Sequence, residues 1–90
     1  MNVPAGTTQP DPIESTILTL TAQRGLEKSI CPSEVARALR PDWQVLLPAV
    51  RHAAARLALA GRIEILRHGQ PVDPASFKGV IRLRALPEQG

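Results

Sequence analysis

The clearest periodic pattern in the chain runs from Trp43 to Gly61, where apolar residues recur at helical spacing. When Val50 is placed at the centre of one helical face, the positions that fall within about 60° of it are apolar. These positions are Trp43, Leu46, Leu47, Ala53, Ala54 and Leu57. Such a stripe predicts a helix packed on a core. Gly61 follows the stripe, and a glycine readily adopts the left-handed conformation that ends a helix.

Pro48 interrupts this pattern, because a proline inside a helix removes one backbone hydrogen bond and clashes with the preceding turn. Two arrangements accommodate it. Either the helix is kinked at Pro48, or residues 43–47 form a separate short turn and the long helix starts at Pro48. We favour the second arrangement. Trp43 is expected to fill the core between the second and third helices.

The residues that begin and end a helix predict a first helix between Asp11 and Gly25. Asp11 is a favourable N-cap, and Pro12 suits the first helical position because an N–H there would have no partner. Glu14 lies three residues after the cap, as in a capping box, and Gly25 is expected to be the left-handed cap. One face carries Ile13, Ile17, Leu20 and Arg24, whereas Leu18 and Ala22 lie off it. These last two are expected to pack under the C-terminal strand or against a second subunit.

A second, shorter helix is predicted over Pro32–Leu39, again with a proline at its first position. The residues expected to face inward are Val35, Ala38 and Leu39. Pro41 ends the helix, because the residue before a proline avoids the helical region. Cys31 lies at or near the N-cap, where a thiol can become reactive through a lowered pKa. A small, half-buried residue is the favoured interpretation of Cys31.

Two alternating segments near the C-terminus predict β-strands at Arg62–Arg67 and Gly79–Arg84. Their inward-facing residues are Ile63, Ile65, Ile81 and Leu83. The segment between them, His68–Lys78, is too long for a tight hairpin and rich in turn-forming residues, so it predicts a wing. Glu64 is expected to pair with an arginine of the second strand. Ile30, in an extended segment before the second helix, is expected to bridge to this hairpin.

The order helix, strand residue, helix, turn, helix, strand, long loop, strand is that of a winged helix-turn-helix. The predicted fold class is therefore α+β, with three helices plus a C-terminal β-hairpin wing. Ninety residues suffice for one domain. We expect a flexible N-terminal arm at residues 1–10, the winged-helix domain at residues 11–85 and a C-terminal tail at residues 86–90.

Several short motifs occur together in this order. They are CPSEVAR at residues 31–37, Trp43, LPAVR at 47–51, GRI at 61–63, VDP at 72–74 and GVIRL at 79–83. Over about Pro12 to Arg84, the chain resembles a family of small bacterial proteins catalogued only as a domain of unknown function, with a winged-helix fold. The resemblance implies the fold and no set of catalytic residues. For function it implies DNA binding, and only by analogy of fold.

Positive charge is concentrated in the second half of the chain, within a net charge of +3. Residues 1–47 carry four Lys or Arg and five Asp or Glu, whereas residues 48–90 carry seven and three. This asymmetry indicates either an anionic partner for the C-terminal half or an ordinary solvated basic surface. The chain has one Trp, one Phe and no Tyr, which argues against a single-stranded nucleic-acid platform, since those stack bases on aromatic rings.

The cysteine count and the apolar runs exclude several classes. One cysteine excludes an intrachain disulfide and a cysteine-based zinc site, and no metal or other cofactor is expected. No apolar run is long enough for a transmembrane helix. Residues 1–10 have neither the charged start nor the apolar block of a signal peptide. A cytoplasmic protein is therefore expected.

The favoured functional hypothesis is a DNA-binding protein, such as a transcriptional regulator. Its third helix would enter the major groove of duplex DNA, and its wing would lie over the backbone or the minor groove. The predicted DNA-binding residues are Gln44, Arg51, His52, Ala55 and Arg56 from the helical part and Arg67, His68 and Lys78 from the wing. Because the outward helix face has few polar residues, backbone contacts are expected to dominate and base readout to be poor.

The alternative is a protein-interaction or dimerisation module on the same scaffold, and a homodimer is compatible with both hypotheses. Leu18, Leu59 and Leu66 are apolar at positions that the core does not obviously use, so together they could mark a partner surface. Single exposed apolar residues are also normal. An enzyme is not expected, because His52 and His68 lie on separate elements and neither has a carboxylate nearby in the sequence.

Overall fold

A computed structural model describes residues 11–87 of the chain. The predicted N-terminal arm, residues 1–10, and the last three residues of the predicted tail lie outside this part. The elements are α2 (Pro12–Arg24), α3 (Pro32–Leu39), a 3-10 helix η1 (Trp43–Leu46), α4 (Leu47–Leu59), β1 (Ile63–Arg67), β2 (Gln70–Pro71) and β3 (Arg82–Ala85). This is the predicted α+β class in a winged-helix arrangement, with one short strand, β2, more than the sequence indicated, and with η1 in place of the short turn predicted at residues 43–47.

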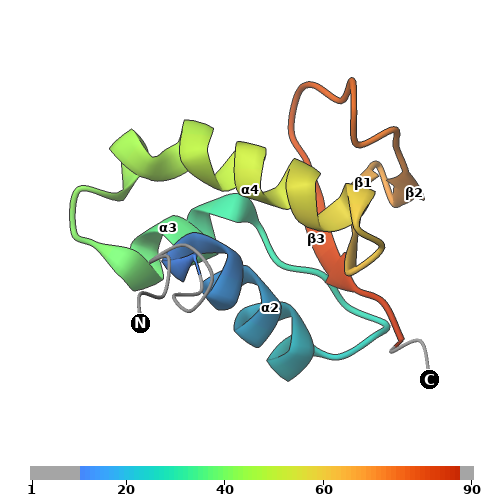
Figure 1. The fold of residues 1–90 in the computed structure, drawn as a ribbon, viewed down its shortest axis with the longest axis horizontal. Helices are drawn as coiled ribbons and strands as arrows, with labels where there is room; N and C mark the ends of the chain where they lie inside the picture. The colour runs from blue at the N-terminus through green and yellow to red at the C-terminus, as the bar shows by residue number, and fades with distance from the viewer. Residues whose placement is uncertain (1–10, 88–90) are drawn as a thin grey trace, which may run out of the picture.

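The helices form one layer and the small sheet closes one end of it (Figure 1). In that view α2 runs along the lower edge and α4 along the upper edge, with α3 between them. The sheet is antiparallel in the order β2-β1-β3. Ile30 joins the helical part to this sheet by an isolated bridge to Leu83, in which each backbone N–H donates to the other residue's carbonyl at 2.8 Å. The predicted bridge is therefore confirmed.

The first helix begins and ends at the predicted residues. The Asp11 carboxylate accepts hydrogen bonds from the backbone N–H groups of Ile13 (2.8 Å) and Glu14 (3.3 Å), and Gly25 ends the helix with a φ of 101°. The expected capping box is only half formed, because the Glu14 carboxylate accepts from the Arg56 side chain. The Glu14 carboxylate therefore binds the Arg56 guanidinium of α4 and does not accept from the backbone N–H of the N-cap residue.

The bounds of α3 are also those predicted, but its inward face is rotated. Val35 and Ala36 are fully buried, whereas Ala38 is exposed. The prediction for Ala38 was wrong because α3 packs between α2 and α4. These two helices cover the side of α3 that carries Val35 and Ala36 and leave Ala38 exposed. The Glu34 carboxylate accepts from the backbone N–H of Cys31 at 2.9 Å, which completes the cap at the start of this helix.

Pro48 is accommodated by the second of the two predicted arrangements. A 3-10 turn precedes α4, and Pro48 occupies the first turn of α4, where its missing N–H costs nothing. Trp43, at the start of η1, is half-buried and packs on the edge of the core. The Arg37 guanidinium carbon lies 4.5 Å from the Trp43 ring centroid. Trp43 therefore covers the rim between α3 and α4 and is not the enclosed core residue that was expected.

The segment predicted as one long loop begins with a tight turn. His68 (φ 53°) and Gly69 (φ 77°) connect β1 to β2, with Arg67 paired to Gln70. Positive φ at both central residues is what a two-residue hairpin of matching twist requires. The chain then returns to β3 through residues 72–81, held by the Asp73 carboxylate, which accepts from the backbone N–H of Ala75 at 2.9 Å. We call residues 68–81 the wing.

The core lies where the three helices meet β1 and β3, and it is aliphatic. Its fully buried side chains include Ile17, Ile30, Val35, Val50, Ile63, Ile65, Ile81 and Leu83. Thr21 is buried as well, and its hydroxyl donates to the Ile17 carbonyl at 2.8 Å. Leu66 is only 5% exposed, so it is not part of a surface patch. The predicted pairing of Glu64 with the second strand is confirmed, since Arg84 Nε donates to it at 3.1 Å.

Candidate nucleic-acid interface

The outward face of η1 and α4 is mostly apolar. Gln44 and His52 are exposed, whereas Ala55 is half-buried. Leu59, near the C-terminal end of α4, has an exposed fraction of 66%. This face therefore offers one amide and one imidazole for hydrogen bonds to base edges.

The Arg51 side chain extends from this face toward the wing. Its Nη1 donates to the carbonyl oxygen of Gly79 at 3.1 Å, and its guanidinium carbon lies 5.1 Å from the centroid of the Phe77 ring. Phe77 in turn packs against the core. Arg51 is thus held in place by a backbone acceptor and an aromatic ring, and neither partner neutralises its charge.

Two further cations of the wing region surround Gly79. The Arg67 side chain is so close that a Cβ atom added to Gly79 would stand 3.1 Å from the Arg67 guanidinium carbon. Lys78 precedes Gly79 and is exposed. Arg51, Arg67 and Lys78 come from α4, β1 and the loop before β3, and the fold brings them together around one glycine. We call these three residues the wing-root cluster. His68, also exposed, follows Arg67 in the turn.

Arg56 does not belong to this cluster, although the sequence placed it in the same surface. Its Nε donates to the Glu14 carboxylate at 2.6 Å, and its Nη2 lies 3.1 Å from the Asp11 carboxylate. The hydrogen bond to Glu14 raises the pKa of Arg56, and the charges of Glu14 and Asp11 add to this effect. Arg56 is therefore a tie between α4 and α2 whose charge is already compensated.

Most carboxylates of the described residues likewise form ion pairs with arginines. The other ion pairs join Arg24 to Glu34, Arg40 to Asp42 and Arg84 to Glu64. Within residues 11–87, no carboxylate lies within 4 Å of a cation of the wing-root cluster. Within the described residues, the cations at the junction of α4 and the wing are therefore without an ion-pair partner. The sequence could not show this, because pairing was not visible in the charge counts.

A groove of about 310 Å³ lies beside the cluster, between the start of α3, the start of α4 and the end of the wing. Its lining is mainly apolar and includes Pro32, Trp43, Leu47, Val80, Ile81 and the Arg51 side chain. Arg37, which sequence reasoning missed, adds a second cation at this edge through its contact with the Trp43 ring.

Cys31 also lines the groove, and its Sγ accepts from the Ser33 hydroxyl at 3.1 Å. Half-burial of Cys31 agrees with the favoured interpretation of that residue.

Residues 10–86 match a protein family described as "Protein of unknown function (DUF3253)". The chain belongs to this family. The match extends from the residue before the N-cap of α2 to the residue after β3, so the DUF3253 domain comprises every element described above. The resemblance indicated by the sequence motifs is therefore confirmed. No curated protein matches the chain.

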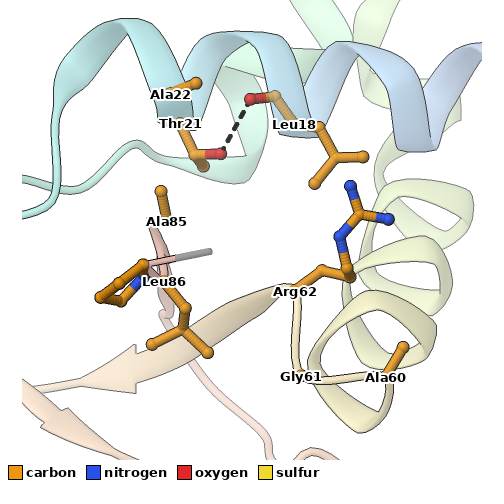
Figure 2. A pocket seen from close by; sticks show the side chains of 9 residues that line it. Leu18, Thr21, Ala22, Ala60, Gly61, Arg62, Ala85 and Leu86 are labelled. Atoms are coloured by element: carbon orange, nitrogen blue, oxygen red, sulfur yellow. Dashed lines mark hydrogen bonds between the residues drawn. The ribbon is translucent and has the colours of Figure 1, made fainter. Parts of the chain in front are cut away.

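The DUF3253 domain has a second, larger hollow of about 590 Å³ between α2 and the ends of β1 and β3 (Figure 2). Leu18 and Ala22 of α2 face Ala85 and Leu86 across it, as expected for residues off the main stripe. The Arg62 guanidinium extends toward Leu18 and is the one ionisable group of the lining. Such a lining provides a partly apolar surface with a single cation.

The predicted patch of Leu18, Leu59 and Leu66 is not one surface, because Leu66 is buried and Leu18 packs against the core. Residues 11–87 contain no group of three or more His, Cys, Asp and Glu side chains arranged to hold a metal ion. In the same part of the chain, no helix is long and apolar enough to cross a membrane.

Proposed function

We propose that this DUF3253 domain binds duplex DNA, as a transcriptional regulator or another DNA-binding protein would. The observation that carries the proposal is the wing-root cluster. The Arg51 and Arg67 side chains meet at Gly79, the exposed Lys78 precedes that glycine, and the carboxylates of residues 11–87 are paired or lie elsewhere. Lys and Arg side chains in such a group neutralise phosphates and release counterions, which supplies most of the affinity of non-specific DNA binding.

The proposal places backbone contacts ahead of base contacts. The cations that support it lie at the root of the wing, whereas the outward face of α4 offers the His52 ring and little else for base edges. Phosphate contacts fix the position of a protein on a duplex but carry no sequence information. We therefore expect one domain to bind many sequences with similar affinity.

The interaction-module alternative is supported by a different feature, the hollow between α2 and β3. A homodimer formed over that hollow would leave the wing-root cluster accessible, because the hollow is lined by α2, the α4–β1 turn and the end of β3. The two proposals therefore use separate surfaces, and a dimer would present two clusters to one duplex.

Fluorescence anisotropy with a labelled random-sequence duplex tests the DNA proposal. If the three cluster residues each contact one phosphate, log affinity falls with log salt at a slope of about −2.7. Raising the salt concentration fourfold, from about 50 to about 200 mM, should then weaken binding about 40-fold. Absence of binding at the lower salt concentration would contradict the proposal.

The charge-matched variants decide where the duplex binds. Arg51→Ala with Arg67→Ala removes two of the three cluster cations, so the slope should fall to about −0.9. Arg40→Ala with Arg56→Ala removes the same charge from residues that are ion-paired. Its slope should stay near the wild-type value, with affinity changed by about twofold through long-range charge alone. Equal losses in the two double variants would show that net charge, and not the cluster, drives binding.

A further inference from the structure

The groove beside the wing-root cluster combines two surfaces that a duplex does not use together. Its lining is mainly apolar, with Trp43 and Leu47 from η1 and the start of α4, and Val80 and Ile81 from the end of the wing. Val80 has an exposed fraction of 84%, the highest of the large hydrophobic residues described. A phosphate backbone is charged and cannot cover such a surface well. Covering it requires an apolar group on the partner.

Cations that have no carboxylate partner within residues 11–87 also lie beside the groove. Arg51 forms part of its wall, Arg37 lies against the ring of Trp43, and the Arg67 guanidinium lies against Gly79. Two of these guanidinium groups, those of Arg51 and Arg67, meet at Gly79, whereas that of Arg37 lies at Trp43. Complementary charge on a partner would therefore be needed at both places.

We propose that the groove binds an acidic protein segment, with an aliphatic side chain seated between Trp43 and Val80 and flanking carboxylates on the arginines. A small molecule fits less well, because small-molecule sites enclose most of their ligand's surface and the wall formed by Val80 is largely exposed. A short segment needs no enclosure, since it gains affinity from one buried anchor and several charge contacts.

This segment shares Arg51 and Arg67 with the proposed DNA surface. The two partners are therefore expected to exclude each other, and an acidic segment would act as an inhibitor of DNA binding. The inference does not depend on DNA binding, because the groove and its cations are present whether or not a duplex binds.

Trp43 provides the measurement, because it is the only tryptophan of the chain and lines the groove. The probe is the blocked peptide Asp-Glu-Asp-Leu-Leu-Asp-Glu-Asp, which contains no tryptophan, titrated at low salt. A saturable blue shift of the Trp43 emission is expected, because the anchor removes water from the indole. Peptides with serines in place of the leucines, or amides in place of the acids, should each bind about tenfold more weakly.

Two matched variants separate the groove from general charge. Val80→Asp places a carboxylate on the groove wall at an exposed position, and about tenfold weaker peptide binding is expected from like-charge repulsion. Leu59→Asp makes the same chemical change at an exposed position on α4 that does not line the groove. Its affinity should stay within about twofold of the wild type, because distant charges are screened.

Several outcomes would overturn the proposal. These are no saturable change in Trp43 emission, equal binding of the serine or amide peptide, and equal losses in Val80→Asp and Leu59→Asp. An emission spectrum that shifts with protein concentration, together with a dimer in sedimentation, would show that a second copy covers the groove. In a separate anisotropy assay the peptide should displace a bound duplex. Persistent duplex binding at saturating peptide would refute the overlap, whereas failure of the duplex to bind at all would leave the peptide result standing.

Discussion

Arg51 and Arg56 lie about one and a half turns apart on α4, yet they have opposite environments. Arg56 is held by two carboxylates of α2. Arg51 donates to a backbone carbonyl of the wing and lies near the Phe77 ring. One arginine joins two helices and has its charge neutralised locally. The other joins a helix to the wing and keeps its charge available.

The difference shows that a position on the flank of a helix does not decide whether an arginine is compensated. In sequence, both arginines are flanks of the same amphipathic helix. In the structure, the N-terminus of α2 faces one of them and the wing faces the other. Local pairing therefore divides a single charged helix into a structural side and a side available for anionic partners.

The largest effect should come from reversing each charge in turn. Arg51→Glu would remove one of the proposed phosphate contacts and add a repulsive charge, so we expect about 30-fold weaker duplex binding at constant salt. Arg56→Glu adds a third carboxylate beside Asp11 and Glu14, so it should lower the melting temperature and change affinity by about threefold at most. Anisotropy and thermal melting measure the two effects. Similar affinities for the two variants would remove the distinction between the arginines.

Gly79 allows the packing of the wing-root cluster to be tested. Its φ of 81° is unfavourable for any residue with a Cβ, and the added carbon would meet the Arg67 guanidinium. Gly69 has a φ of 77° but has nothing within 4 Å of the added carbon. We expect Gly69→Ala to lower the unfolding free energy by about 1 kcal/mol and Gly79→Ala by about 2 kcal/mol in urea titrations. Equal losses would mean that Arg67 moves aside at little cost.

Asp11 serves both as the N-cap of α2 and as a partner of Arg56, and two substitutions separate these roles. Asp11→Ala loses both and should lower the unfolding free energy by about 1 kcal/mol, mostly through the cap. Asp11→Asn keeps a good cap and loses only an exposed ion pair, so it should be near neutral. Urea titration of both variants provides the comparison. A large loss in Asp11→Asn would show that the ion pair matters more than the cap.

The smallest effect concerns Glu34, whose carboxylate is paired with Arg24 as that of Glu14 is with Arg56. The Cys31 backbone N–H lowers the pKa of Glu34 below its ordinary value of 4.5, and the nearby Arg24 adds to this. Its stabilisation is therefore present above pH 4.5 and is lost as the pH falls through the lowered pKa. Glu34→Gln should cost about 0.5 kcal/mol at neutral pH, allowing for solvent screening, and nothing in strong acid. If the difference in unfolding free energy between Glu34→Gln and the wild type grew as the pH fell, it would contradict this prediction.

The helix ends were predictable because each depends on one or two capping residues. Asp11 with Pro12, the Pro32 start of α3 and the Gly25 end of α2 each act on the backbone locally, so their effect survives in any tertiary context. Pro48 likewise separated η1 from α4. By contrast, the tight turn at His68 and Gly69 was missed, because the turn-forming residues continue beyond it and hid the short β2 strand within a longer loop.

The candidate site was only half predictable. The sequence identified Arg51, Arg67 and Lys78 as cations of the second half, but it could not distinguish them from Arg56. That distinction depends on Glu14, which lies at the other end of the domain in sequence and reaches Arg56 only after α2 packs on α4. The rotation of α3 that buries Ala36 in place of Ala38 has the same origin, since three-helix packing decides which face is covered.

The bridge between Ile30 and Leu83 has a consequence for how the domain opens. Both backbone amides are bonded, both residues are fully buried, and they lie 53 residues apart in the sequence. Closing so long a loop costs conformational entropy, and the contacts that offset this cost form only when the intervening helices pack. These two amide protons should therefore be among the slowest to exchange with solvent deuterium, whereas amides of the wing exchange through local fluctuations. Exchange at Ile30 and Leu83 would then report the global unfolding free energy, and it would slow further when a ligand binds the folded domain.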